Sequence, residues 1–125
     1  MKTPLDNMWS LVHNKIMNEA KPVSAERSDI FDRWLKELKD PRARARVIVR
    51  TKRLEQGNPG DVEPVGEGIS EMKIDYGPGY RVYYKSFREK IIILLCGGDK
   101  RRQQADIKEA KRIANSYEKE HENEN

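Results

Sequence analysis

The segment EMKIDYGPGYRVYYK, residues 71–85, decides which fold this sequence adopts. On both sides of Gly77-Pro78-Gly79, apolar and polar residues alternate with a period of two, which is typical of strands that have one face in water. The glycines and the proline between the two runs predict a tight turn. The segment therefore predicts an antiparallel β-hairpin in which Met72, Ile74 and Val82 share one face.

The other face of this hairpin carries residue types that can perform chemistry on phosphates. Residues on one face of an antiparallel pair lie side by side, so this face would gather an open cluster of Glu71, Lys73, Arg81 and Tyr83. Arg81 can hold a phosphate through two donors and stabilise charge as it develops. Lys73 would serve as acid or base, with Glu71 as the alternative base. An ordinary solvated sheet face with cross-strand ion pairs would show the same alternation, and the pattern alone does not choose.

Two helices are expected before the hairpin. Ser28 or Asp29 would cap the first, and Asp40-Pro41 ends it and opens the second, which runs to about Gln56. Residues 22–27, before both helices, can form a short strand. Apolar residues recur at helical spacing and form two stripes, Phe31, Trp34, Leu35 and Leu38 in the first helix and Ala43, Val47, Thr51 and Leu54 in the second.

A central strand and a last helix are expected after the hairpin. Ile91 to Cys96 is apolar on both faces, which suits a strand in the middle of a sheet. The order is strand, helix, helix, three or four antiparallel strands and helix. It predicts an α+β fold in which two helices cover one face of a small antiparallel sheet and part of the other face stays polar. The inner face of the last helix would be formed by Ile107, Ala110, Ile113, Ala114 and Tyr117.

The second of the expected helices is strongly basic. Against one carboxylate, that of Glu55, it carries Arg42, Arg44, Arg46, Arg50, Lys52 and Arg53. A basic helix can hold the phosphate backbone of a nucleic acid, dock an acidic segment of a partner protein, or simply lie in water. All three interpretations stay open at this point.

Composition argues against several classes of protein. The 125 residues suffice for one domain, and the net charge of +4 suits a polyanionic or acidic partner. Cys96 is the single cysteine and lies in an apolar run, so we expect a buried thiol and no disulfide. His13 and His121 stand outside the central domain, which argues against a histidine-pair ribonuclease and against a metal site. We expect no cofactor, no membrane span and no signal peptide, and hence a cytoplasmic protein.

The first 21 residues are expected to form a helical extension to a domain of residues 22–119, which is followed by a polar tail over residues 120–125. The extension starts at Thr3-Pro4, a typical helix start, and carries a stripe of Leu5, Met8, Trp9, Val12 and Ile16. So short a helix is marginal alone. The stripe is therefore expected to dock on its own domain, on a second copy of the chain or on a partner, and we favour the first two.

Five short pieces of the sequence occur together in a fixed order. They are FDRWL (31–35), RARAR (42–46), GNPGD (57–61), YGPGYRVY (76–83) and LLCGGDK (94–100). With these pieces and their spacing, the chain from about Ser28 to Ala114 resembles the RelE/ParE toxin superfamily, in particular its HigB-like, phage-associated addiction module killer branch. One piece would mean little, but five together are specific.

The resemblance implies the RelE-like fold, with two N-terminal helices packed on a small antiparallel sheet and a C-terminal helix. It also implies the toxin of a type II toxin–antitoxin system, whose cognate antitoxin is usually a helix-turn-helix protein. Many relatives are mRNA interferases, which cleave mRNA on the ribosome by attack of a ribose 2′-hydroxyl on the adjacent phosphate. By this resemblance Arg81 corresponds to an arginine that contacts the scissile phosphate, and Lys73 to a strand lysine on the same surface. Asp106 or a neighbour stands where RelE-type enzymes place a tyrosine.

From these observations we predict a ribosome-dependent endoribonuclease that binds mRNA, the ribosome and an antitoxin, with a possible homodimer through the N-terminal helix. Two alternatives stay open, because one fold serves all of them: a ParE-like toxin that inhibits DNA gyrase without nuclease activity, and an inactive remnant that only binds an antitoxin. The predicted catalytic residues are Arg81, Lys73, Glu71 and Lys100, and the predicted RNA-binding residues are Arg44, Arg46, Lys52, Tyr83, Arg101 and Arg102.

Overall fold

The structure, a computed structural model, describes residues 24–88 and 91–122, with side chains described as far as Glu120. The predicted helical extension of residues 1–21 lies outside the described residues, as does the end of the predicted polar tail. In the part of the chain that is described, no helix is long and apolar enough to cross a lipid bilayer.

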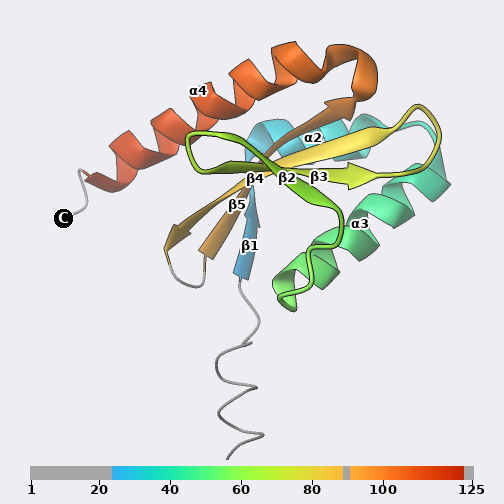
Figure 1. Cartoon of the computed structure of the whole chain (residues 1–125), viewed down its shortest axis with the longest axis horizontal. Coiled ribbons are helices and arrows are strands. Elements are labelled where there is room, and N and C mark those ends of the chain that lie inside the picture. Colours follow the sequence, from blue (N-terminus) through green and yellow to red (C-terminus); the bar gives the residue numbers. More distant parts are fainter. Residues whose placement is uncertain (1–23, 89–90, 123–125) are drawn as a thin grey trace, which may run out of the picture.

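One five-stranded sheet forms the middle of the molecule, with helices on both faces (Figure 1). The strands lie in the order β1-β5-β4-β3-β2. The predicted hairpin, the two helices before it and the helix after it are all present. In chain order the elements are β1 (Ser24–Arg27), α2 (Asp29–Glu37), α3 (Pro41–Glu55), β2 (Val62–Gly66), β3 (Ile69–Ile74), β4 (Tyr80–Arg88), β5 (Ile91–Asp99), the 3₁₀ turn η1 (Lys100–Arg102) and α4 (Gln103–Glu122).

The sheet is mixed, so the predicted antiparallel pairing holds for β2 to β5 but not for β1. Strands β2 to β5 pair in antiparallel fashion, but β1 pairs in parallel with β5, with Ser24 opposite Ile91 and Arg27 opposite Leu94. The chain passes through α2, α3 and three strands between β1 and β5, and a connection of that length permits parallel pairing. Alternation within a four-residue strand carries no information about the direction of that strand.

The sequence pattern did not locate β2. This strand lies at the edge of the sheet, pairs with β3, and shifts its register between Pro64 and Gly66. Proline cannot donate to a β-ladder and is confined mainly to edges and bulges. An edge strand of this kind does not show the regular alternation that makes β3 and β4 recognisable.

Two capping side chains fix where α2 and α3 begin. The hydroxyl of Ser28 accepts the N–H of Phe31 at 3.0 Å and donates to the carbonyl oxygen of Leu95 at 2.6 Å. Ser28, and not Asp29, is therefore the cap of α2, and it also ties this helix to β5. At the start of α3, the carboxylate of Asp40 accepts the N–H of Arg42 at 2.9 Å.

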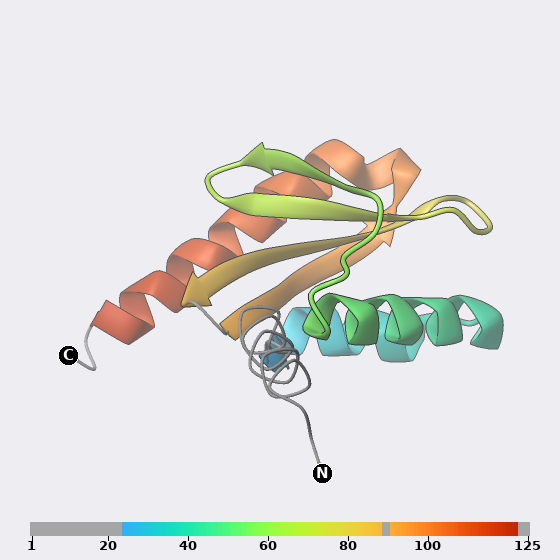
Figure 2. The same ribbon diagram turned by 60° about the horizontal axis from the view of Figure 1, so that its bottom comes forward.

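The buried apolar residues divide into two clusters, one on each face of the sheet. Figure 2 shows α2 and α3 on one side of the sheet and α4 on the other. In the first, α2 and α3 pack on Met72, Ile74 and Val82, as the alternation predicts. In the second, α4 packs on the opposite face. The predicted inner face of α4 is confirmed, since Ile107 and Tyr117 pack against the second cluster and its buried members include Ala110, Ile113 and Ala114.

A bulge in the β4–β5 ladder places two consecutive tyrosines in different clusters. Tyr83 pairs with Cys96 while Tyr84 pairs with Leu94, so Leu95 is the extra residue. As a result, Leu95 and Cys96 both belong to the cluster under α4. Cys96 is buried, as predicted, and burial raises the pKa of its thiol to about 12.

Candidate functional site

The β3–β4 hairpin brings the four predicted polar residues together. In its register, Glu71 lies opposite Tyr83 and Lys73 lies opposite Arg81. All four belong to the face on which α4 packs, since Met72, Ile74 and Val82 occupy the other face. The predicted neighbours are therefore neighbours in the structure.

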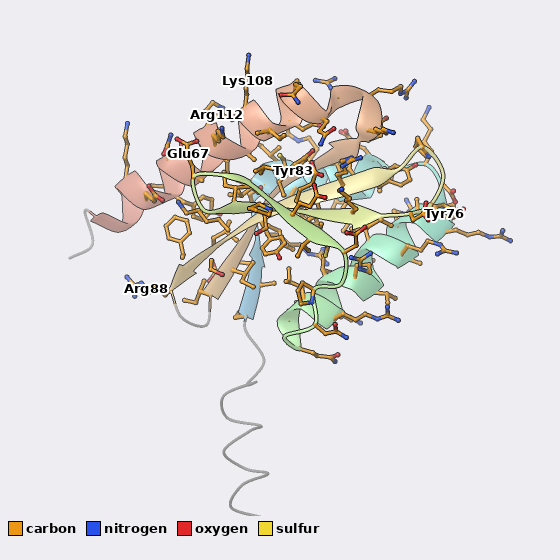
Figure 3. All side chains as sticks on the ribbon, viewed as in Figure 1. Glu67, Tyr76, Tyr83, Arg88, Lys108 and Arg112 are labelled. Atoms are coloured by element: carbon orange, nitrogen blue, oxygen red, sulfur yellow. The ribbon has the colours of Figure 1, made fainter. Side chains whose placement is uncertain are left out.

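The expectation that this cluster lies on an open face is wrong for two of its members. Glu71 and Tyr83 are both 0% exposed, and Figure 3 shows Tyr83 between the sheet and α4. The side chains of Arg81 and Lys73 are 12% and 30% exposed. Strand alternation shows which residues share a face, but not that a helix later in the chain covers that face. In this structure Tyr83 has no exposed surface for the RNA contact predicted for it.

The buried carboxylate of Glu71 is the centre of a hydrogen-bond network that joins β3, β4 and α4. It accepts hydrogen bonds from Arg81 Nη1 at 2.5 Å, from the Tyr83 hydroxyl at 3.1 Å and from Gln103 Nε2 at 2.9 Å. Burial, and then the negative charge of Glu71, raise the pKa of Tyr83, so its hydroxyl stays protonated and donates. A buried charge needs such partners. Both oxygens of Glu71 are engaged, so this side chain holds Arg81 in place.

Gln103 is a member of the cluster that the sequence analysis missed. It stands 32 residues from Glu71 in the sequence, at the first position of α4. A glutamine at a helix start has no special spacing or composition around it. Only the packing of α4 on the sheet reveals its contact with Glu71.

Within the described part of the chain, Arg81 has a hydrogen-bond donor without an acceptor, whereas the ammonium group of Lys73 is paired. The Nε–H of Arg81 is buried and has no acceptor among the described residues. Leaving a buried donor without an acceptor costs about 1–3 kcal/mol, which a water molecule or a ligand that accepts this N–H would offset. Lys73 Nζ instead lies 3.0 Å from a carboxylate oxygen of Glu63. Glu63 could not be recognised from the sequence, because the pattern of residues 62–66 does not reveal β2.

Asp106 of α4 packs against the strand residue that lies opposite Arg81. Gly98 is opposite Arg81 in the β4–β5 ladder, and a Cβ atom added to Gly98 would overlap the carboxylate of Asp106. The Asp106 side chain thus fills the space that a side chain at position 98 would occupy. Its Oδ2 is buried without a hydrogen-bond partner among the described residues, and burial raises the pKa of this carboxyl. One unused donor and one unused acceptor therefore share the same corner of the sheet.

The basic turn η1 follows directly after the Arg81–Gly98 pair. Lys100, Arg101 and Arg102 are all exposed, and Arg101 Nη2 lies 3.1 Å from a carboxylate oxygen of Asp99. The hydrogen bond from Arg101 lowers the pKa of Asp99. Beside this turn is a cleft of about 490 Å³, whose walls include Trp34, Gly97, Arg101, Arg102 and Asp106. Two of the three cations, Arg101 and Arg102, thus line the same opening as Asp106.

The basic residues of α3 lie elsewhere. α3 and α4 pack on opposite faces of the sheet (Figure 2), and Glu71 and Arg81 lie on the face of α4. The structure therefore does not bring the predicted RNA-binding residues Arg44, Arg46 and Lys52 to the cluster. Of the predicted RNA-binding residues, Arg101 and Arg102 are the exposed ones at the same end of the sheet as Arg81.

The arrangement described above is a small α+β domain, with a mixed sheet between α2–α3 and α4, and it is consistent with the RelE-like fold in general. A family model described as "Phage derived protein Gp49-like (DUF891)" matches residues 33–118, and the chain belongs to this family. The family is a phage-derived one of the toxin–antitoxin type, within the RelE-like addiction-module superfamily.

The chain is also similar to a protein of Haemophilus influenzae (strain ATCC 51907 / DSM 11121 / KW20 / Rd) that is described as an "Uncharacterized protein". The two are 54% identical over 84 residues, which cover 67% of this chain and 85% of the relative. No solved structure matches the chain.

Proposed function

We propose that this chain is the toxin of a type II toxin–antitoxin pair in the HigB-like branch, and that it cleaves mRNA on the ribosome. The family supports the toxin–antitoxin setting. One observation carries the ribonuclease proposal: two partly exposed side chains keep unused hydrogen-bonding atoms, a donor on Arg81 and an acceptor on Asp106, which packs against the residue opposite Arg81. A ribose 2′-hydroxyl next to a phosphate offers the matching acceptor and donor. The toxin would work in the cytoplasm and be silenced by a helix-turn-helix antitoxin.

Arg81 is the residue that we assign to the scissile phosphate. Glu71 fixes its guanidinium from one side, so the Arg81 side chain loses little conformational freedom when the phosphate binds. Charge that develops on the phosphate oxygens is then stabilised by a donor already in place, the largest single contribution in many enzymes. Lys73 adds a second cation, and Lys100, Arg101 and Arg102 would hold the flanking RNA backbone.

Asp106 is the residue that we assign to the proton of the 2′-hydroxyl. A raised pKa brings a carboxylate closer to the proton affinity that general bases need. In the reaction the 2′-oxygen forms a bond to phosphorus, its proton passes to Asp106, and the bond from phosphorus to the 5′-oxygen breaks. Lys73 or Lys100 would protonate the leaving 5′-oxygen, which gives a 2′,3′-cyclic phosphate and a 5′-hydroxyl. Glu71, predicted as an alternative base, becomes in this proposal a positioning residue.

The test is expression of the chain in cells, with mapping of mRNA 5′ ends and of their terminal chemistry. We expect new 5′-hydroxyl ends inside translated reading frames, and we expect these ends to disappear when translation initiation is blocked. A supercoiling assay with DNA gyrase runs in parallel. Gyrase inhibition with intact mRNA would replace this proposal by the ParE-like alternative. A folded chain with neither activity would leave the inactive remnant.

A further inference from the structure

The positive charge of the molecule is concentrated on α3 and is not neutralised there. This helix carries six cations and one carboxylate, a net charge of +5, against +4 for the whole chain. The rest of the sequence therefore has a net charge of −1. Among residues 24–88 and 91–122, no carboxylate forms an ion pair with any cation of α3, although eight ion pairs occur on other elements.

A groove along the outer side of α3 combines these cations with apolar surface. Its volume is about 580 Å³, and it lies between α3 and the end of β3. Arg42, Arg46, Val49 and Arg53 line it at helical spacing, and Ile74 and Asp75 form its other side. Among the side chains that the structure describes, Val49 is the one large hydrophobic residue classed as exposed, at 47%. We refer to this feature as the α3 groove.

Two arginines of the α3 groove are held in place before any partner arrives. The guanidinium of Arg46 lies 4.5 Å from the centre of the Tyr76 ring, and the Tyr76 hydroxyl donates to Asp40 at 2.8 Å. Figure 3 shows Tyr76 beside α3. Arg50 donates to the carbonyl oxygens of Lys73 at 2.7 Å and Pro59 at 3.0 Å. Fixed cations lose less conformational entropy when they bind an anionic group.

We propose that the α3 groove binds an acidic peptide segment of a partner protein, with one apolar side chain of that segment seated on Val49 and Ile74. Carboxylates on either side of this anchor would pair with Arg42, Arg46 and Arg53. The charges are complementary. The exposed Val49 favours a peptide over a nucleic acid, because a phosphate backbone offers no apolar group to cover it.

The location of the groove gives a second reason to choose a peptide. The α3 groove is on the sheet face opposite to Arg81 and Glu71, so its occupant need not be the proposed RNA substrate. The inference goes beyond the proposed function and does not require nuclease activity. In a toxin–antitoxin pair, such a segment would belong to the antitoxin.

The test is a selection of binders from a random peptide library displayed on phage, with the full-length chain as the target. We expect enriched peptides to be rich in aspartate and glutamate around one large apolar residue. Amide NMR spectra of the unaltered chain with a selected peptide should shift most along α3 and at residues 74–76. This measurement maps the site without any substitution in the protein.

Three variants then decide whether the α3 groove is specific. Arg46→Glu and Val49→Asp alter exposed side chains, so both variants should fold. Each should lower the affinity for a selected peptide by about tenfold or more. Lys108→Glu makes the same charge change as Arg46→Glu on the outer side of α4 and should leave affinity within about twofold. Replacing the apolar residue of the peptide by serine should cost affinity in the unaltered chain but little in Val49→Asp.

Several results would overturn the proposal. One is a selection that yields no acidic and apolar consensus. Another is binding that survives both α3 variants, or NMR shifts that lie outside α3. If an oligouridine competes the peptide away and binds α3 more tightly than the peptide, the surface is a nucleic-acid surface and the peptide proposal fails.

Discussion

Arg81 Nη1 lies 2.5 Å from Oε1 of Glu71, and it joins β4 to β3 through a carboxylate whose side chain is only 1% exposed. This pair explains how a guanidinium can be both nearly buried and accurately placed. Glu71 also accepts hydrogen bonds from Tyr83 and Gln103, so the position of Arg81 depends on β3, β4 and α4 together. Stability and the proposed chemistry are therefore linked at this pair.

Glu71→Gln should lower the free energy of unfolding by about 3 kcal/mol, because it leaves the guanidinium of Arg81 without its buried counter-charge. Chemical denaturation followed by circular dichroism measures this loss. The matched control is Glu118→Gln, which removes the carboxylate partner of Lys85 in a pair that is far more exposed. That change should cost less than about 1 kcal/mol. Equal losses in the two variants would contradict a special role for the buried pair.

Arg81→Lys should leave a cation for Glu71 but remove the planar fork that we assign to the phosphate. We expect a small change in melting temperature and a fall in the rate of mRNA cleavage of about 100-fold, the usual cost of one preorganised donor. Primer extension on a translated reporter mRNA gives the rate. Arg112→Lys, on α4 beside Glu109, serves as the control and should cleave normally. Cleavage by Arg81→Lys at the unaltered rate would remove Arg81 from the proposed site.

Asp106→Asn should stabilise the protein at neutral pH and leave its stability in acid unchanged. Burial raises the pKa of Asp106 above its ordinary value of 3.8, so the folded state prefers the protonated form. Its favourable contribution is complete below pH 3.8 and is lost as the pH rises through the folded-state pKa. The variant, which cannot ionise, should match the parent in acid and melt at a higher temperature near pH 7. Melting curves across this range measure the difference.

The same variant also tests the proposed chemistry, because the two effects have opposite signs. Asp106→Asn should be more stable at neutral pH and yet lose mRNA cleavage. Asp75→Asn replaces an exposed carboxylate and should show neither effect. A variant that is stabilised and still cleaves would leave Asp106 as a purely structural residue.

Charge reversal at Arg101 and at Arg44 should separate the two basic surfaces. Arg101 is exposed at the end of the sheet where Arg81 lies, and Arg44 is on α3 behind the sheet. For single-stranded RNA, each lost phosphate contact reduces the slope of log affinity against log salt by about 0.7. We expect this reduction for Arg101→Glu and a smaller one for Arg44→Glu, measured by fluorescence anisotropy in a salt series. Equal reductions would support the sequence-based prediction that α3 also contacts RNA.

The elements whose evidence is local could be predicted from the sequence alone. The period of two around Gly77-Pro78-Gly79 determined the β3–β4 hairpin, and with it the pairing of Lys73 with Arg81. Helical spacing determined α2, α3 and the inner face of α4. These features follow from backbone geometry over a few residues, which the chain carries in its own pattern of apolar side chains.

The contacts that those faces make could not be predicted in the same way, because they depend on how the helices pack on the sheet. Glu71 is on the predicted face of β3, but α4 buries it and brings Gln103 to it. Asp106 packs against Gly98, opposite Arg81, because the missing side chain of Gly98 leaves room for its carboxylate. The parallel pairing of β1 with β5 likewise depends on a long connection. Contacts between segments far apart in the chain arise from packing, and no local period records them.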